Sequence, residues 1–391
     1  MSKPKITFRC PVFDFSGYAT ISRNIVLELY KTDEYDIVIE PLRWVNSGNI
    51  PMDPEDHKIL VDLEKRHIEP GYKDDIKNRT LVHMSIAPEY TFPHGFKKAF
   101  GLTMLETDKI PPVWIDKCNQ MDGMIVPSYF NLSSFTKSGV TSPIRAVPFG
   151  VDFDMYNLDR KPLLSAEDLP TKFNFLLVGQ WGHLDRKNIR ETITRFLSTF
   201  RGNTEVGLIA KIYNTGAGTL DRMQIEETIQ VLRNQLNMKE DEGPQIHLVH
   251  GALTAEEMSA LYHNADVFIL PSLGEAWGMP IIEAVASGIP VITTGGTGAE
   301  TYLNPDLSIM LNYKWQPIPQ SLWWQGVYEP QQEITMPDWD EFERMLKRVV
   351  TLSDVTKVNA LKQREELITR DFTWKNCAQT LVNTLRELGG I

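Results

Sequence analysis

The chain has 391 residues, 42% of them hydrophobic and 23% charged, and a net charge of −11. This length predicts about two domains with an ordinary core, and the acidic balance disfavours nucleic acid as the main partner. The three cysteines have no metal-ligand or redox spacing, the N-terminus "MSKPKITFRC" does not read as a signal peptide, and no apolar run reaches the roughly 18 residues of a spanning helix. We therefore expect a cytoplasmic protein, with peripheral membrane contact and the oligomeric state left open.

The first half of the chain alternates strands and helices. "KITFRC" predicts a strand, followed by a glycine-containing loop and a helix on which Ile21, Ile25 and Leu29 share one face. "TLVHMSIA", "AFGLTMLE", "DGMIVPS" and "IRAVPFGVD" predict further strands, and "SYFNLSSFTKSG" predicts a short helix. We interpret the polar, proline-containing stretch 157–172 as a linker.

The second half repeats this architecture without a close sequence repeat. "FNFLLVG", "EVGLIAKIYN", "QIHLVHG", "ADVFIL" and "IPVITT" predict strands with helices between them, and two helices end the chain. Residues 308–342 are less regular and predict a long surface excursion. Such alternation is typical of mostly parallel sheets with helices on both faces. The fold class is therefore α/β, with two Rossmann-like domains that face each other across a cleft.

The stretch "VGQWGHLDRKNIRETITRFLSTF" predicts a strand that ends at Gly179 and a helix with Asp185 as its N-cap. Arg186 and Lys187 would then lie in the first helical turn, where the helix dipole disfavours cations unless an anion binds there. Helix-start amides together with Arg and Lys make a good diphosphate site. The alternative is a solvated surface pair, and the residues alone leave both interpretations open.

The stretch "PSLGEAWGMPIIEAVASGIPVITT" predicts a loop and an apolar helix between two buried strands. Glu275 lies in the loop, and Glu283 lies in the first turn of the helix. A carboxylate would repel a phosphate at this edge, whereas it can accept two hydrogen bonds from the diol of a sugar or a ribose. A nucleotide sugar fits both charge patterns. The alternative is that the two glutamates face solvent.

Four other features are candidates with a structural alternative each. Gly17, at a strand-to-helix turn, lets the backbone approach a ligand or only makes the turn tight. The loop 295–298 either cradles phosphate or only connects elements. Glu106 and Asp108 either bind an acceptor hydroxyl or cap a turn. The excursion's tryptophans either stack on sugar or pack, and we favour packing; these are Trp315, Trp323 and Trp324.

Over nearly its whole length the chain resembles the retaining glycosyltransferases of family 4, which have the GT-B fold. "SLGEAWGMPIIEAVASGIPVITT" resembles the Glu-x7-Glu signature of that family, and "VGQ…DRKN" resembles its diphosphate-binding turn. The resemblance implies an N-terminal acceptor-binding domain (1–165), a C-terminal nucleotide-sugar-binding domain (166–370) and a final helix (371–391) that crosses back to the first domain.

The resemblance also implies roles for individual residues. Glu275 would bind the hydroxyls of the transferred sugar, Glu283 the ribose, and Arg186 with Lys187 the diphosphate. The remaining donor contacts would come from Gly17, Gly179, Gln180, His250, Gly251, Trp277, Gly278, Met279 and Pro280. Gln180 stands where many members carry Arg, and Glu106 lies nearest the place of a histidine that often contacts the donor sugar.

The resulting hypothesis is a hexosyltransferase that moves a sugar from a UDP- or GDP-sugar to a hydroxyl of a glycan or a similar acceptor. The mechanism would be front-face and metal-independent, with no cofactor beyond the nucleotide sugar, because Lys187 and Arg186 stabilise the leaving diphosphate. Glu106 and Asp108 complete the candidate catalytic set. The alternatives are a nucleotide-sugar epimerase on the same fold and a non-catalytic sugar-binding protein.

Overall fold

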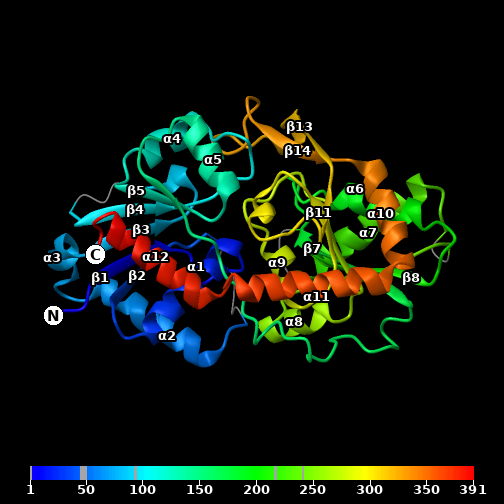
Figure 1. Ribbon diagram of the computed structural model, residues 1–391, viewed down its shortest axis with the longest axis horizontal. Coiled ribbons are helices and arrows are strands. Elements are labelled where there is room, and N and C mark those ends of the chain that lie inside the picture. Colours follow the sequence, from blue (N-terminus) through cyan, green and yellow to red (C-terminus); the bar gives the residue numbers. More distant parts are fainter. Residues whose placement is uncertain (1, 45–50, 92–94, 215–217, 240–241) are drawn as a thin grey trace. The chain divides into compact units, whose positions relative to one another are not determined.

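The computed structural model describes the whole chain except residues 1, 45–50, 92–94, 215–217 and 240–241. The chain divides into two compact units (Figure 1). Unit 1 comprises Met1–Val151 and Asp371–Ile391, and unit 2 comprises Asp152–Arg370. The stretch 157–172, which the sequence suggested as a linker, lies in unit 2, where the amide of Leu163 donates to the carbonyl of Ala260.

Unit 1 contains a six-stranded parallel sheet in the order β2-β1-β3-β4-β5-β6. The strands are β1 (Lys5–Cys10), β2 (Asp36–Pro41), β3 (Thr80–Met84), β4 (Lys98–Leu102), β5 (Gly123–Val126) and β6 (Ile144–Ala146). The helices are α1 (Gly17–Lys31), α2 (Pro54–Lys65), α3 (Tyr72–Asp75), α4 (Pro112–Cys118), α5 (Tyr129–Ser138) and α12 (Trp374–Glu387). The inner strands β3, β4 and β5 are almost entirely buried, as parallel strands covered on both faces must be, whereas the edge strand β6 is only partly buried.

The C-terminal helix α12 packs on α1, the first helix of the chain (Figure 1). Its apolar face includes Leu381, Val382 and Leu385, which are fully buried. Beyond the helix, the carbonyl of Gly390 accepts hydrogen bonds from the hydroxyl of Thr80 and the ammonium of Lys97. The end of the chain is thus part of the core of unit 1.

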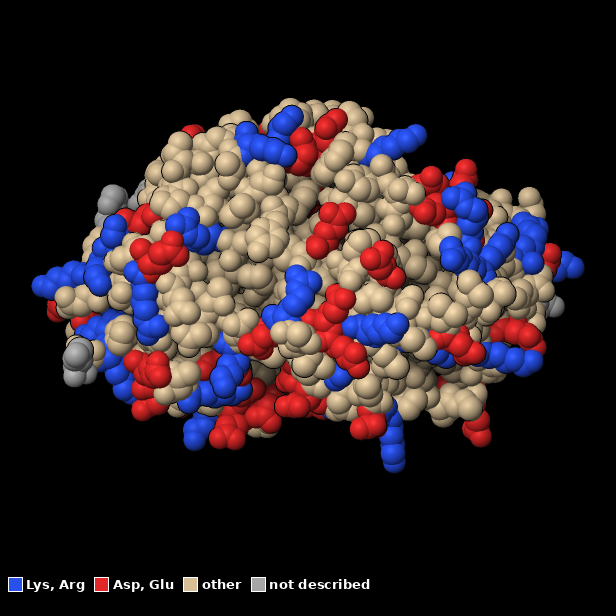
Figure 2. Space-filling model, in the orientation of Figure 1, with Lys and Arg blue, Asp and Glu red and all other residues tan. Residues whose placement is uncertain are grey.

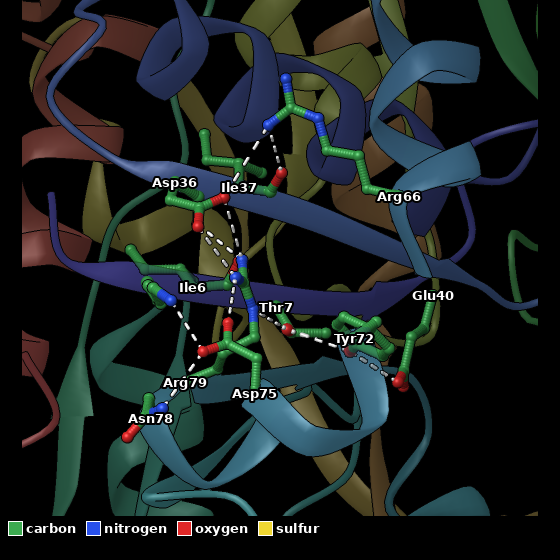
Figure 3. Close-up of polar contacts among 11 residues, drawn as sticks. Ile6, Thr7, Asp36, Ile37, Glu40, Arg66, Tyr72, Asp75, Asn78 and Arg79 are labelled. Carbon is green, nitrogen blue, oxygen red and sulfur yellow. Dashed lines mark hydrogen bonds and ion pairs between the residues drawn. The ribbon is translucent and has the colours of Figure 1, made fainter. Parts of the chain in front are cut away.

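A buried arginine ties together the amino ends of the first three strands of unit 1 (Figure 3). Arg79 is 2% exposed and precedes β3. Its guanidinium donates to the carboxylates of Asp36 at 3.0 Å and Asp75 at 3.2 Å, to the hydroxyl of Thr7 and to the carbonyl of Ile6. A cation at this depth requires such partners, so the network is structural.

Unit 2 contains a second six-stranded parallel sheet, in the order β12-β11-β10-β7-β8-β9. The strands are β7 (Phe173–Gln180), β8 (Val206–Tyr213), β9 (Gln245–Val249), β10 (Val267–Leu270), β11 (Val291–Thr294) and β12 (Ile309–Leu311). The helices are α6 (Ile189–Thr199), α7 (Thr219–Gln235), α8 (Ala255–Tyr262), α9 (Met279–Ala286), α10 (Trp339–Thr351) and α11 (Ser353–Thr369). Two parallel sheets covered by helices confirm the predicted α/β class.

The late excursion is more regular than the sequence suggested. It begins with β12, the sixth strand of the sheet, and continues as a two-stranded antiparallel sheet of β13 (Tyr313–Pro317) and β14 (Glu333–Pro337) (Figure 1). The prediction of an irregular segment was wrong. The five exposed residues of β13 alternate aromatic and polar side chains, but the prolines and glutamines around them hide so short a strand pattern.

The strand order of each unit fixes where a ligand can bind. In unit 1 the order reverses between β1 and β3, and in unit 2 it reverses between β7 and β10. The loops that follow such a pair of strands diverge, which leaves a crevice at their carboxyl ends. The loops 181–188 and 271–278 flank the switch point of unit 2.

The distribution of charged side chains on the surface bears on whether the protein binds nucleic acid. On the face drawn in Figure 2, acidic and basic side chains are interspersed, with no broad basic field. Among the described residues, no helix is both long and apolar enough to cross a membrane.

Candidate functional site

The loop after β7 brings two cations to the switch point of unit 2. The amide of Trp181 donates to the carbonyl of Tyr213, which carries the chain past the end of the sheet. The loop then reverses: Asn188 adopts the left-handed conformation, with φ of 61°, and its side-chain amide donates to the carbonyl of Pro271. The backbone carbonyl of Arg186 accepts from the amide of Leu273. This loop is therefore bonded to the loop that follows β10.

Arg186 and Lys187 precede α6 and do not lie in its first turn, so that prediction was wrong. The helix begins at Ile189, because the left-handed Asn188 breaks the helical path before it. Asp185 caps the helix from within the loop: its carboxylate accepts from the amides of Ile189 and Arg190 at 2.8 and 2.9 Å. These helix-start amides are therefore already bonded to a carboxylate.

Glu275 lies directly against the two cations. Its Oε1 is 2.6 Å from the Nζ of Lys187 and 3.5 Å from the guanidinium of Arg186, which also donates to the carbonyl of Gly274. Burial alone would raise the pKa of Glu275, but the attraction of Lys187 and then of Arg186 outweighs it and lowers the pKa below its usual value. Glu275 is only 4% exposed and stays ionised.

This contact differs from the arrangement expected from the sequence, in which the carboxylates and the cations had separate tasks. A carboxylate at this depth must be paired, and the two cations supply the pairing. Two cations and one carboxylate leave the cluster with a net positive charge. We call Arg186, Lys187 and Glu275 the switch-point cluster.

Glu283 is held in a different environment on α9. Its carboxyl group accepts a 2.8 Å hydrogen bond from the hydroxyl of Tyr262, and Tyr156 also bonds to it. Burial raises the pKa of Glu283 to about 7, although the two tyrosines favour the ionised form. Glu283 remains partly exposed. Its protonation therefore changes near neutral pH.

The turn before α9 is shaped by glycine and by a tyrosine. Gly278 has a φ of 87°, and a Cβ there would lie 2.9 Å from the side chain of Ile281. The hydroxyl of Tyr302 donates to the carbonyls of Trp277 and Gly278 at 3.0 and 3.1 Å. Within the described chain, no side chain caps the start of α9, and Pro280 lies in its first turn. In contrast to α6, this helix begins without a carboxylate on its first amides.

The glycine-rich loop after β11 supports the turn that carries Glu275. The amide of Gly298 donates to the backbone carbonyl of Glu275 at 2.6 Å, and a Cβ at Gly298 would lie 1.8 Å from the carbonyl oxygen of Ala276. The amide of Gly295 donates to the carbonyl of Leu311, and that of Gly296 to the carboxylate of Glu300. Since all three amides are already bonded, this loop is a connection rather than a phosphate cradle.

A chain of hydrogen bonds runs along the carboxyl ends of β7, β8 and β9. The side-chain amide of Gln180 donates to the carbonyl of Asn214, whose own amide donates to the carboxylate of Asp221. The same carboxylate lies 2.9 Å from the Nε2 of His250, and both of these side chains are buried. The ring of His250 is therefore fixed by Asp221.

Lys211 on β8 contacts Gly251, the residue after His250 at the carboxyl end of β9. Its ammonium donates to the carbonyl of Gly251 at 2.6 Å, and burial lowers the pKa of this lysine. Gly251 has a φ of 100°, which favours glycine at this position.

Three candidate residues belong to unit 1. Gly17 is exposed at the start of α1, where the hydroxyl of Ser16 caps the helix by accepting from the amide of Ala19. A Cβ on Gly17 would meet no atom within 4 Å, so the fold itself does not require glycine there. Glu106 and Asp108 are half-buried after β4, and Asp108 lies 3.5 Å from Lys109. The roles of these three residues stay predictions.

Sequence reasoning missed several residues that position the site. Tyr156, Tyr262 and Tyr302 are buried and bond to Glu283 or to the turn before α9. Asp221 and Lys211 were also missed. Each of them is far in sequence from the residue it contacts, so no local pattern could reveal it. In the part of the chain that the structure describes, no three His, Cys, Asp or Glu side chains gather in a way that could hold a metal ion.

Comparison with known proteins shows what this region is similar to. Residues 172–309 match the family model of the glycosyl transferases group 1. The chain is 22% identical over 325 residues to "Putative glycosyltransferase 45" of Sulfolobus islandicus filamentous virus, with 81% of each chain covered. It is 26% identical over 156 residues to D-inositol 3-phosphate glycosyltransferase of Corynebacterium jeikeium, covering 39% of this chain and 36% of that enzyme. The chain thus spans only about a third of the length of the second relative.

The fold also matches solved structures. HepE of Anabaena, solved in complex with UDP-glucose, superposes with a TM-score of 0.65 at 12% identity and covers 98% of this chain and 99% of its own. This likeness confirms the two-domain fold of GT-B type. Together, the family model and the relatives named as glycosyltransferases support glycosyltransferase group 1 and a transferase enzyme.

Proposed function

From the premise of a group 1 transferase, we propose that this protein is a retaining hexosyltransferase. It moves a sugar from a nucleoside diphosphate sugar of the UDP-glucose or GDP-mannose type to a hydroxyl of an acceptor. The observation that carries the proposal is the switch-point cluster, in which Lys187 lies 2.6 Å from the buried Glu275 where β7 and β10 diverge. No metal or other cofactor is required in this proposal.

The two cations of the cluster suit a departing diphosphate. Negative charge grows on this group as the bond to the anomeric carbon breaks, and fixed cations aimed at that charge are a large catalytic contribution. Lys187 and Arg186 keep a net positive charge beside Glu275. The start of α9, which carries no capping side chain in the described chain, adds the positive end of a helix dipole at the same edge.

The carboxylates suit the two sugars of the donor. Glu275 is ionised, and an ionised carboxylate only accepts hydrogen bonds, as binding of sugar hydroxyls requires. Glu283 on α9 accepts the ribose hydroxyls in the same way, and the end of β9 with His250 and Gly251 lies near the base. The leaving diphosphate takes the proton of the acceptor hydroxyl in a front-face displacement, so that the sugar keeps its configuration.

The test is incubation of the protein with UDP-glucose and with GDP-mannose, each without acceptor, followed by proton NMR of the anomeric region. A retaining transferase slowly hydrolyses one donor, and the first sugar released is the α-anomer. Lys187→Met abolishes this hydrolysis. Conversion of the sugar to an epimer identifies an epimerase, and binding of a donor with no turnover at all identifies a non-catalytic binding protein.

A further inference from the structure

The antiparallel sheet of unit 2 and its connection carry an unusual composition. We call residues 313–337 the aromatic hairpin; it comprises β13, β14 and the segment between them. From 313 to 333 it contains three tryptophans, two tyrosines and five glutamines, against one lysine and two glutamates. This composition is uncommon for a surface segment, because exposed aromatic rings are usually few and exposed charges are usually many.

The rings of this hairpin are partly exposed, so packing uses only part of the surface of each ring. The exposed fractions are 37% for Trp315, 46% for Trp323, 49% for Trp324 and 38% for Tyr313. The core of the hairpin is made by other residues: Ile318, Leu322 and Ile334 are each less than 5% exposed. The tryptophans are therefore not needed to fill the interior of the hairpin.

The hairpin is bonded to the loop that carries Glu275. The amide and the hydroxyl of Thr335 on β14 both donate to the carbonyl of Leu273 at 3.0 Å. Thr335 pairs across the sheet with Trp315, so the two residues share one face. That face is therefore turned toward the loop after β10, at Leu273, which lies two residues before Glu275.

A second contact places Tyr313 beside the same region. Tyr313 and Trp315 are two apart on β13 and share a face, and their ring centroids are 6.0 Å apart with perpendicular planes. The ring of Tyr313 covers Gly296, where an added Cβ would lie 2.2 Å from it. Two residues further on, Gly298 bonds to the backbone of Glu275. The exposed rings thus begin next to the switch-point cluster.

The ring orientations are fixed as a binding surface requires. The indole nitrogen of Trp323 donates to the carbonyl of Ile318 at 3.1 Å, and Trp324 lies edge-on to Tyr328. Rigid aromatic side chains lose little conformational freedom when a ligand binds them. The segment between the two strands also carries exposed glutamines, whose side chains offer both donors and acceptors; they are Gln320 and Gln325.

We propose that the aromatic hairpin is a carbohydrate-binding subsite that holds sugar units of the acceptor. The negative face of an aromatic ring attracts the C–H groups of a sugar, and the neighbouring amides match its hydroxyls. The charges disfavour the main alternative for an exposed tryptophan surface, an anionic membrane, because such a membrane attracts basic segments and this one has a net charge of −1 between 313 and 333. The proposal deepens the proposed function, because it makes the acceptor a glycan.

The test uses the full chain labelled with 5-fluorotryptophan, whose nine tryptophans give resolvable fluorine NMR signals. Trp→Leu variants assign the three hairpin signals. The probes are gluco-, manno- and galacto-oligosaccharides of two to six units, in α- and β-linked forms, added without nucleotide. At least one series shifts the signals of Trp315, Trp323 and Trp324. Trp315→Leu and Trp324→Leu each weaken its Kd by about fivefold or more.

Trp339→Leu is the matched control, since this partly exposed tryptophan lies on α10 against Phe342 and Arg195. It leaves the oligosaccharide Kd unchanged, and every variant keeps its affinity for nucleoside diphosphate within twofold. The proposal is overturned if no oligosaccharide shifts the hairpin signals, or if the Trp315 and Trp324 variants bind as the parent does. Hairpin signals that respond instead to phosphatidylglycerol vesicles or to protein concentration also overturn it. Because no nucleotide is present, these outcomes are independent of donor turnover.

Discussion

Lys187 and Glu275 form a coupled pair, and this coupling decides how variants at the site behave. Each side chain is mostly buried and within 2.6 Å of the other. Removing either one leaves the other with a weaker counter-charge at depth, which costs free energy of folding. When Lys187 is removed, Arg186 limits the loss because it stays 3.5 Å from the same oxygen of Glu275. When Glu275 is neutralised, two cations remain side by side.

We predict that Lys187→Met and Glu275→Gln each lower the free energy of unfolding by about 1–3 kcal/mol. The free energy of unfolding of the double variant falls by less than the sum of the two single losses, and the difference is a coupling energy of about 0.5–3 kcal/mol. Urea unfolding of the four proteins measures this. The exposed pair Arg222–Glu226 on α7 is the control, with a coupling of about 0.3–0.5 kcal/mol. If the losses of the two single variants simply add up in the double variant, Lys187 and Glu275 do not form a coupled pair.

The raised pKa of Glu283 leads us to predict that donor binding depends on pH. Its pKa of about 7 lies above its unfolded value of 4.5, so the carboxyl is neutral below pH 7 and ionised above it. If the ionised form accepts the ribose hydroxyls, affinity for the donor rises from pH 6 to pH 8. Calorimetry with the intact nucleotide sugar measures this, because its diphosphate diester does not titrate in that range.

The control for this prediction is Glu283→Gln, which keeps the shape but cannot ionise. It binds the donor with an affinity that stays flat over the same pH range. The same raised pKa makes a contribution to stability that is fully present below pH 4.5 and is lost as the pH rises through 7. A donor affinity that is independent of pH in the parent protein counts against the assignment of ribose to Glu283.

At the scale of single residues, the sequence indicated that these side chains lie at one edge of the sheet, but not which of them form contacts with one another. Glu275, Glu283, Arg186 and Lys187 could be singled out because they follow buried strands at a predicted sheet edge. The ion pair could not, since residues 187 and 275 are linked only through the strand order. The three tyrosines around α9 were missed for the same reason.

At the scale of elements, the strands of both sheets were largely predictable because buried parallel strands are short apolar runs. The boundary of α6 was not, because the left-handed Asn188 is encoded by nothing more than an asparagine. α11 was missed between the two predicted final helices. Its apolar residues do not form one face, and several of them, such as Val355 and Val358, are exposed.

The start of α1 offers a test that separates folding from function. Gly17→Ala meets no atom of the fold, and alanine favours a helix, so the variant is more stable by about 0.4–1 kcal/mol. If a ligand approaches this backbone, the added methyl group lowers kcat/KM for transfer. Thermal unfolding and steady-state kinetics of the same preparation measure both effects. If the variant is more stable and fully active, no ligand approaches the backbone of Gly17, and the residue is not part of the site.

At the scale of the whole molecule, the chain passes between the units at two adjacent points. The amide of Val151 donates to the carbonyl of Phe372 at 3.0 Å, and Val151 forms a bridge with Thr373. Gly150 fits so closely that a Cβ there would lie 2.2 Å from the backbone nitrogen of Trp374. Both crossings are therefore held inside unit 1.

This arrangement predicts which fragments fold. Residues 152–370 fold alone and bind nucleoside diphosphate, because all of unit 2 and the switch-point cluster are present. Residues 1–151 alone do not fold, since the apolar face that α12 covers is exposed. A short glycine–serine linker from 151 to 371 restores a folded unit 1, because the two ends are adjacent. Circular dichroism and calorimetry test these outcomes; a folded 1–151 fragment contradicts the role given to α12.

The position of α12 also has a consequence for synthesis. Proteins leave the ribosome from the N-terminus, and their first domain ordinarily folds first. Here the sheet of unit 1 must wait for the closing helix, so unit 2, which is nested within unit 1 in the sequence, is finished before the part that precedes it. During that interval the nascent chain exposes the apolar surface of α1 that α12 later covers, and chaperones would bind it there. Truncation within the last helix should therefore send the polypeptide to degradation even though the switch-point cluster of unit 2 is already formed.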